Sequence, residues 1–124
     1  MSQIIAIAAG GAIGALMRFW VSSGVATIFG RTFPYGTLTV NVFGSLLMGF
    51  LYVMLVDRVQ WSVEWRAALL IGLLGAFTTF STFSIETLNL FEQGEQLKAF
   101  LNILFSVVLC ITATWLGVLA GRQI

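Results

Sequence analysis

Long apolar stretches separated by short polar connections dominate this chain. An α-helix needs about 20 apolar residues to cross the hydrocarbon core of a bilayer, and four segments meet that length. They run from about Gln3 to Val25, Tyr35 to Val56, Arg66 to Phe91 and Leu97 to Gly121. The connections between them are Arg31 to Pro34, Asp57 to Glu64 and Glu92 to Gln96. The pattern predicts an all-α membrane protein in which residues 1–124 form one integral membrane domain with four spans.

Composition supports the same class of protein. Of the 124 residues, 59% are hydrophobic and 9% are charged, whereas soluble domains carry roughly 25% charged residues. The mean hydropathy is +1.00. Thirteen glycines and a single proline favour helices packed through small residues over a barrel of alternating strands. The N-terminal stretch lacks a basic region and a cleavage site, so we expect a spanning helix there and not a removed signal peptide.

Several chemistries are excluded by what the sequence lacks. It has no histidine and one cysteine, Cys110, inside an apolar run. A histidine-based catalytic triad, a zinc site and a disulfide within one chain are therefore not expected. The net charge of +1 gives no electrostatic footprint for nucleic acid.

Charge in the connections gives almost no preferred orientation. With four spans, both termini and the second connection share one side. That side carries Arg58, Arg66 and Arg122, and the other carries Arg31 and Lys98. Lysine and arginine bias sets orientation, and here it is nearly balanced. Either the chain inserts both ways up, which permits an antiparallel homodimer, or one weak signal is enough.

The third span contains an unusual run of hydroxyls and rings, Gly-Ala-Phe-Thr-Thr-Phe-Ser-Thr-Phe-Ser at 75–84. Lipid tolerates so many hydroxyls only where they face protein, water or a polar solute. Glycine and threonine lower helix propensity, so one interpretation is a local break between Gly75 and Thr79. The alternative is a continuous helix whose hydroxyls bond to the preceding turn.

Two aromatic residues and one amide suit a small anion. Phe80 and Phe83 are three residues apart and lie on nearly one helix face, and the edge of an aromatic ring is electropositive. Asn41 is the only amide in the second span and offers two N–H donors. The alternative for all three is ordinary packing or an interhelical hydrogen bond.

Other polar residues in the spans allow more than one interpretation each. Arg18 lies within the first span, where an arginine is a functional candidate or an interface anchor. Glu86, at the end of the aromatic run, is expected at a pore mouth, as a cap on a packing contact or in solvent. Ser106, Cys110 and Thr114 recur every four residues, which is typical of a pore wall or of a helix–helix seam.

Three motifs together resemble the small bacterial fluoride channels of the Fluc family. They are Gly-Leu-Leu-Gly-Ala-Phe-Thr-Thr-Phe-Ser-Thr-Phe-Ser at 72–84, Gly-Gly-Ala-Ile-Gly-Ala-Leu-Met-Arg at 10–18 and Gly-Thr-Leu-Thr-Val-Asn at 36–41. With four spans and a matching length, the resemblance covers essentially the whole chain. It implies a channel and not an enzyme, located in the bacterial cytoplasmic (inner) membrane.

The resemblance also implies an assembly and a set of site residues. The assembly is an antiparallel, dual-topology homodimer in the lipid bilayer, with a broken third span and two pores lined by both subunits. Fluoride would contact the ring edges of Phe80 and Phe83 and the amide of Asn41. Ser81, Thr82, Thr114 and Ser106 would add hydroxyls, with Arg18 and Glu86 near the vestibule or mouth. One structural sodium ion per dimer would lie at the subunit interface, bound by the carbonyls of Gly75 and Thr78.

These inferences favour a fluoride-selective channel that lets cytoplasmic fluoride leave passively. Fluoride is small and strongly hydrated, so several weak donors can replace its water shell without trapping it. One alternative is a small multidrug-type, proton-coupled exporter, although its chemistry needs a carboxylate that the first span lacks. Another is a non-conducting assembly subunit whose polar residues only join helices.

Overall fold

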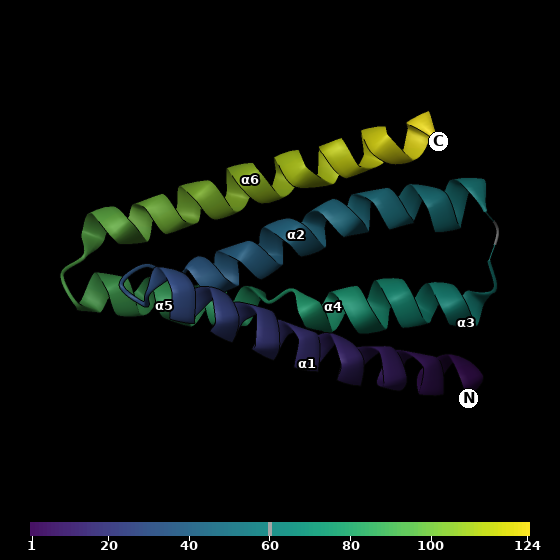
Figure 1. Ribbon diagram of the computed structural model, residues 1–124, viewed down its shortest axis with the longest axis horizontal. Helices are drawn as coiled ribbons and strands as arrows, with labels where there is room; N and C mark the ends of the chain where they lie inside the picture. Colours follow the sequence, from purple (N-terminus) through teal and green to yellow (C-terminus); the bar gives the residue numbers. More distant parts are fainter. Residues whose placement is uncertain (60) are drawn as a thin grey trace.

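Four long apolar helices make up the molecule, as the hydropathy pattern predicts. The computed structural model describes residues 1–59 and 61–124, and all of its regular elements are helical (Figure 1). The stretches long and apolar enough to cross a membrane are Ser2–Phe29, Tyr35–Arg58, Val63–Glu92 and Gln96–Gln123. The expected connection between the second and third spans includes Gln60, which lies outside the described residues.

The second and third spans are each assembled from several elements, whereas the first and fourth are single helices. The elements in chain order are α1 (Ser2–Phe29), α2 (Tyr35–Tyr52), the π-helix η1 (Val53–Arg58), α3 (Val63–Arg66), the π-helix η2 (Ala67–Leu73), α4 (Leu74–Phe77), α5 (Phe80–Glu92) and α6 (Gln96–Gln123). Two glycines with positive φ follow helix ends, Gly30 at 93° and Gly94 at 81°. Glycine adopts this left-handed conformation without a Cβ penalty, so both connections can turn tightly.

Glycines set how closely the helices approach. In Figure 1, α2 runs beside α6, and α1 lies along α3 and α4. A Cβ on Gly49 of α2 would overlap the carbonyl of Thr114, and one on Gly117 of α6 would overlap that of Leu46. Backbones of membrane helices approach this closely only where both surfaces carry small residues. The α2–α6 contact is therefore tight over its length.

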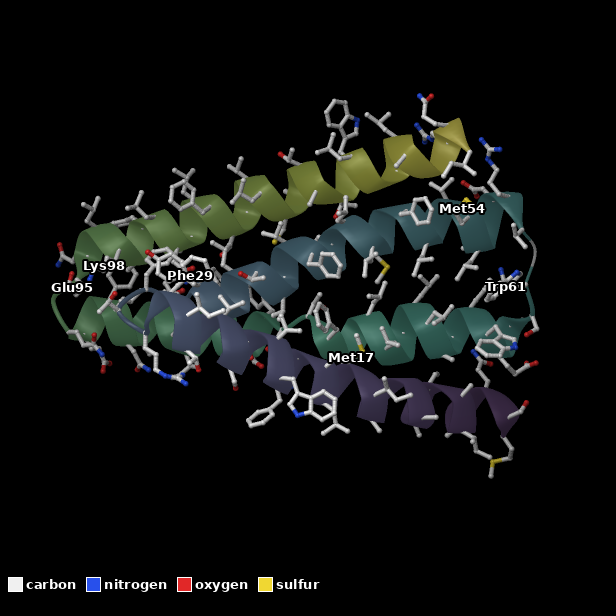
Figure 2. All side chains as sticks on the ribbon, in the orientation of Figure 1. Met17, Phe29, Met54, Trp61, Glu95 and Lys98 are labelled. Atoms are coloured by element: carbon white, nitrogen blue, oxygen red, sulfur yellow. The ribbon has the colours of Figure 1, made fainter. Side chains whose placement is uncertain are left out.

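The two ends of the bundle differ in what they carry. Both termini lie at one end (Figure 1), where Figure 2 also shows Trp61 and Met54. Glu95 and Lys98 are at the opposite end, with 3.7 Å between the Glu95 Oε2 and Lys98 Nζ atoms. An even number of spans places the termini on one side, as the sequence predicts.

Most of the surface of a single chain is apolar and uncovered. Only 11% to 28% of the residues in the four apolar windows are buried inside the molecule. The exposed side chains include Phe80, Phe19 and Phe43. Soluble proteins rarely leave such large apolar areas uncovered, which agrees with surroundings of lipid or further protein.

Candidate functional site

The helical path of the third span is interrupted at two threonines. Between α4 and α5, Thr78 has φ −90° and ψ 159°, and Thr79 has φ −153° and ψ 116°. Both residues have extended backbone dihedrals. The interruption lies near the middle of the apolar stretch Val63–Glu92, so apolar residues both precede and follow it.

Side chains supply the hydrogen bonds that the extended residues lose. The Asn41 Nδ2 atom donates to the Thr79 carbonyl at 3.0 Å, and the Thr79 N–H donates to Asn41 Oδ1 at 2.7 Å. Thr79 also caps α5, because its hydroxyl oxygen accepts from the Thr82 N–H at 3.2 Å. Unpaired backbone groups are costly in lipid, so these bonds permit non-helical backbone there. Asn41 retains one N–H that this clamp does not use.

Two backbone carbonyls lose their usual helical donors at this interruption. In a continuous α-helix, the donors to Gly75 and Thr78 would be the N–H groups of Thr79 and Thr82. Those N–H groups donate instead to Asn41 and to the Thr79 hydroxyl. The oxygens of Gly75 and Thr78 are thereby left with capacity for another partner.

Arg18 lies beside the same interruption and not in the polar cavity described below. Its Nε atom donates to the Ala76 carbonyl at 3.0 Å. Ala76 belongs to the last turn of α4, where carbonyls have no intrahelical donor. The structure thus places the first-span arginine where it binds the end of a helix.

A groove of about 370 Å³ opens beside the interruption. Its lining combines α2, the extended threonines, the start of α5 and the middle of α6. The lining residues are Asn41, Gly44, Ser45, Met48, Thr78, Thr79, Phe80, Phe83, Ser106, Val107, Cys110, Ile111 and Thr114. Five of the predicted pore residues are among them: Asn41, Phe80, Phe83, Ser106 and Thr114.

The two phenylalanines form a pair at this groove. The ring centroids of Phe80 and Phe83 are 5.3 Å apart and the ring planes meet at 47°. Phe80 is 78% exposed in the single chain, whereas Phe83 is half-buried. Both rings line the groove, and the exposed part of Phe80 is left for whatever covers this face.

Ser81 and Thr82, also predicted to line the pore, do not line this groove. Their hydroxyl oxygens lie 3.4 Å and 3.0 Å from Thr79 Oγ1. Thr79 itself lines the groove. The two residues consequently join the groove only through the Thr79 hydroxyl.

A second cavity, of about 310 Å³, lies at the end of the molecule that holds the α1–α2 connection. Its polar lining residues include Ser22, Ser23, Arg31, Thr37, Thr82, Glu86, Asn89 and Gln93. The Oε1 atom of Glu86 is buried and has no hydrogen-bond partner among the described residues. Thr82 lines this cavity while bonding to Thr79 of the groove, so a line of hydroxyls connects the two hollows.

The structure adds one residue that the sequence analysis missed. Asn102 is 2% exposed, its Nδ2 atom donates to Thr87 Oγ1 at 2.9 Å, and Ser106 donates to its Oδ1 atom at 3.5 Å. A polar amide inside an apolar span is a functional candidate in its own right. That signal was present in the fourth span.

A metal site built from side chains is not found in the part of the chain that the structure describes. No group of three His, Cys, Asp or Glu side chains lies together in residues 1–59 and 61–124. A cation bound near the interruption would depend on backbone and hydroxyl oxygens. The carbonyls of Gly75 and Thr78 fit that requirement, because the donors that a helix would give them are used elsewhere.

Comparison with known proteins gives consistent matches. A family model described as CrcB-like protein, Camphor Resistance (CrcB), matches residues 5–118. A protein of Methylococcus capsulatus called "Fluoride-specific ion channel FluC" is 60% identical over 98% of this chain, and the chain spans 54% of that relative's length. Relatives of the same name from Coxiella burnetii and Geobacter sulfurreducens are 49% and 48% identical, over 98% and 100% of this chain and 99% and 100% of their own lengths.

Proposed function

The chain belongs to the CrcB-like family, and from this membership we propose that it is a fluoride-specific, multi-pass membrane channel. The observation that carries the proposal is the groove beside Thr78 and Thr79. It gathers one amide, several hydroxyls and the Phe80–Phe83 pair on an otherwise apolar surface.

The groove offers several groups that carry partial positive charge, and no lysine or arginine side chain lines it. The unused N–H of Asn41 and the ring edges of Phe80 and Phe83 each carry partial positive charge. A dehydrated fluoride ion can exchange its water shell for several such groups. Because each contact is weak, the ion can also leave, and conduction requires this.

A second copy of the chain would complete the pore. Phe80 is 78% exposed although it lies at the groove, so a covering surface is needed to enclose the path. Nearly balanced charges on the two sides allow copies of opposite orientation to meet. We place two pores in an antiparallel homodimer, each lined by both subunits.

The interruption in the third span has two roles in this proposal. It breaks the helix where the spans of the two copies cross, and it exposes carbonyls within the membrane. Unwound backbone of this kind binds Na⁺ in other membrane proteins. Gly75 and Thr78 from both copies would bind one structural sodium ion, whose fixed charge raises anion occupancy nearby.

The polar cavity at Glu86 would serve as a mouth of the pathway. Thr82 lines this cavity and links it to the groove through the Thr79 hydroxyl, to which Ser81 also bonds. The channel would lie in the cytoplasmic membrane. Hydrofluoric acid that enters from acidic surroundings dissociates at cytoplasmic pH, and the anion then leaves down its electrochemical gradient. This passive efflux would lower the fluoride concentration in the cytoplasm and so protect against fluoride toxicity.

Efflux from reconstituted liposomes tests the proposal. Liposomes containing the purified full chain are loaded with fluoride or with chloride, and efflux is followed with an ion-selective electrode. The expected result is rapid fluoride efflux with chloride efflux no faster than from protein-free liposomes. Equal release of both ions, or no release of fluoride, would contradict the proposed selectivity.

A further inference from the structure

A chain of buried hydrogen bonds runs from the groove to the backbone of α5. Ser106 Oγ donates to Asn102 Oδ1 at 3.5 Å, and Asn102 Nδ2 donates to Thr87 Oγ1 at 2.9 Å. Thr87 Oγ1 in turn donates to the Phe83 carbonyl at 2.7 Å. Asn102, Thr87 and Ser106 are 2%, 6% and 8% exposed. Of these three residues, only Ser106 lines the groove. Asn102 therefore contacts the groove indirectly, through its hydrogen bond with Ser106.

The protons that make these three hydrogen bonds all point away from the groove. Ser106 has a single hydroxyl proton, and it is directed at Asn102. The side of Ser106 that faces the groove therefore presents oxygen lone pairs. Lone pairs repel an anion, so in this arrangement Ser106 cannot contribute to binding fluoride.

A turn of the Asn102 amide would reverse the direction of this series of hydrogen bonds. Rotation about its last side-chain bond exchanges Oδ1 and Nδ2, which have similar shape. Thr87 would then donate to Oδ1, Nδ2 would donate to Ser106 Oγ, and the Ser106 proton would turn into the groove. The Phe83 carbonyl keeps its helical donor, the Thr87 N–H. In either direction Ser106 Oγ, Asn102 Oδ1, Asn102 Nδ2 and Thr87 Oγ1 each keep one hydrogen-bond partner.

Resting on the proposed function, we propose that Asn102 is a positioning residue whose amide turns over to make Ser106 a donor to the passing anion. The reversal gives up the 2.7 Å bond from Thr87 Oγ1 to the Phe83 carbonyl and a weaker bond between Ser106 and Asn102. The Ser106–Asn102 separation of 3.5 Å is well beyond the roughly 2.7–2.8 Å typical of hydroxyl donors. In the reversed chain Ser106 accepts one bond and donates another, and linked bonds of this kind strengthen each other.

The residue acts through Ser106, which makes the proposal testable by a double-mutant cycle. Asn102→Leu keeps the branching at Cγ but removes both polar atoms, so no amide N–H is left to hold the Ser106 oxygen with its proton toward the anion. Initial fluoride efflux should fall about three- to tenfold, the range expected for one hydrogen bond. In a Ser106→Ala background the same change should have no further effect on efflux, since the hydroxyl on which it acts is gone.

A matched background and a stability measurement separate positioning from packing. Thr114 lines the same groove but bonds to the Ser45 carbonyl at 3.2 Å and not to Asn102. In a Thr114→Val background, Asn102→Leu should therefore retain its full effect on efflux. Thermal unfolding in detergent should report the loss of the Asn102–Thr87 bond equally in all backgrounds. Asn102→Ala, smaller and equally apolar, replaces the leucine variant if that variant does not elute as a folded dimer.

The outcomes distinguish this proposal from the proposed function itself. Absence of fluoride efflux from the unmodified chain would contradict the channel assignment. If the unmodified chain conducts, two results would overturn the role of Asn102. One is unchanged efflux in Asn102→Leu, and the other is an equal loss in the presence and absence of the Ser106 hydroxyl.

Discussion

Single residues in the groove divide between those that hold the backbone and those to which the proposed function assigns contact with the ion. Asn41 uses its Oδ1 atom and one N–H on Thr79, which leaves one donor for a ligand. The side chains of Phe80 and Phe83 make no hydrogen bonds and offer only their ring edges, so their proposed contribution to anion binding can be removed without disturbing the clamp.

Replacing either ring by an aliphatic side chain should reduce conduction. Phe80→Ile or Phe83→Ile keeps bulk and apolarity but removes the electropositive edge, and the loss in fluoride efflux should be about tenfold. Phe19→Ile, on an exposed ring of α1 outside the groove, should leave efflux unchanged. Efflux that is equal in all three variants would exclude a role for ring edges.

The identity of these residues could be predicted from sequence, but their hydrogen bonds could not. Asn41 is the only amide of its span, and Phe80 and Phe83 lie on nearly one helix face among hydroxyls, which was enough to select them. That Thr79 takes both ends of the Asn41 amide depends on the approach of α2 to the interruption, a contact between residues 38 apart in the chain. Asn102 carried the same signal as Asn41 and was overlooked, whereas its bond to Thr87 could not be predicted, because it follows from the packing of α5 on α6.

Among the elements, the start of α5 depends on one cap. Thr79 accepts from the Thr82 N–H at 3.2 Å, and threonine-to-alanine changes at such positions cost about 0.5–2 kcal/mol. Thr79→Ala should lower the thermal unfolding temperature of the purified protein, and Thr79→Ser should restore most of it. Thr27→Ala is the matched control, because the exposed Thr27 hydroxyl bonds only to the Ser23 carbonyl. A loss in Thr27→Ala as large as that in Thr79→Ala would show that capping is not the cause.

The contact between α2 and α6 should be intolerant of added volume. A Cβ on Gly49 would overlap the Thr114 carbonyl, whereas a Cβ on Gly24 of α1 meets nothing within 4 Å. Gly49→Ala should destabilise the protein by about 1–3 kcal/mol, and Gly24→Ala should not. Thermal unfolding of the two variants in the same detergent measures the difference. Equal stability would mean that the two helices are not tightly apposed.

The helices and their irregular segments could be predicted only in part from the sequence. Apolar length predicted the four helices, and low helix propensity at Gly75 and Thr79 suggested one place to look for irregular backbone. The π-helical segments η1 and η2 were not foreseen. Their sequences, Val-Met-Leu-Val-Asp-Arg and Ala-Ala-Leu-Leu-Ile-Gly-Leu, contain no residue that distinguishes a wider helix from an α-helix.

For the whole molecule, the proposed assembly makes a prediction about sidedness. Gln123 lies at the end of the bundle that carries the termini, and Glu92 lies at the opposite end with Glu95. In a Cys110→Ala background, Gln123→Cys and Glu92→Cys should each be labelled to about half by a membrane-impermeant maleimide on intact cells, because dual topology exposes each end of half the copies. Full labelling of one variant and none of the other would establish a single orientation.

Passive conduction selective for fluoride can be measured as the reversal potential of the channel current. The purified full chain is fused into a planar bilayer with a tenfold fluoride gradient and equal, high chloride on both sides. For a fluoride-selective channel the current reverses at a voltage about 59 mV from zero, the value for a monovalent ion at a tenfold gradient. The sign of that voltage is the one that the fluoride gradient dictates. A reversal near zero would show that chloride passes as well, and the absence of current would show that the groove does not conduct.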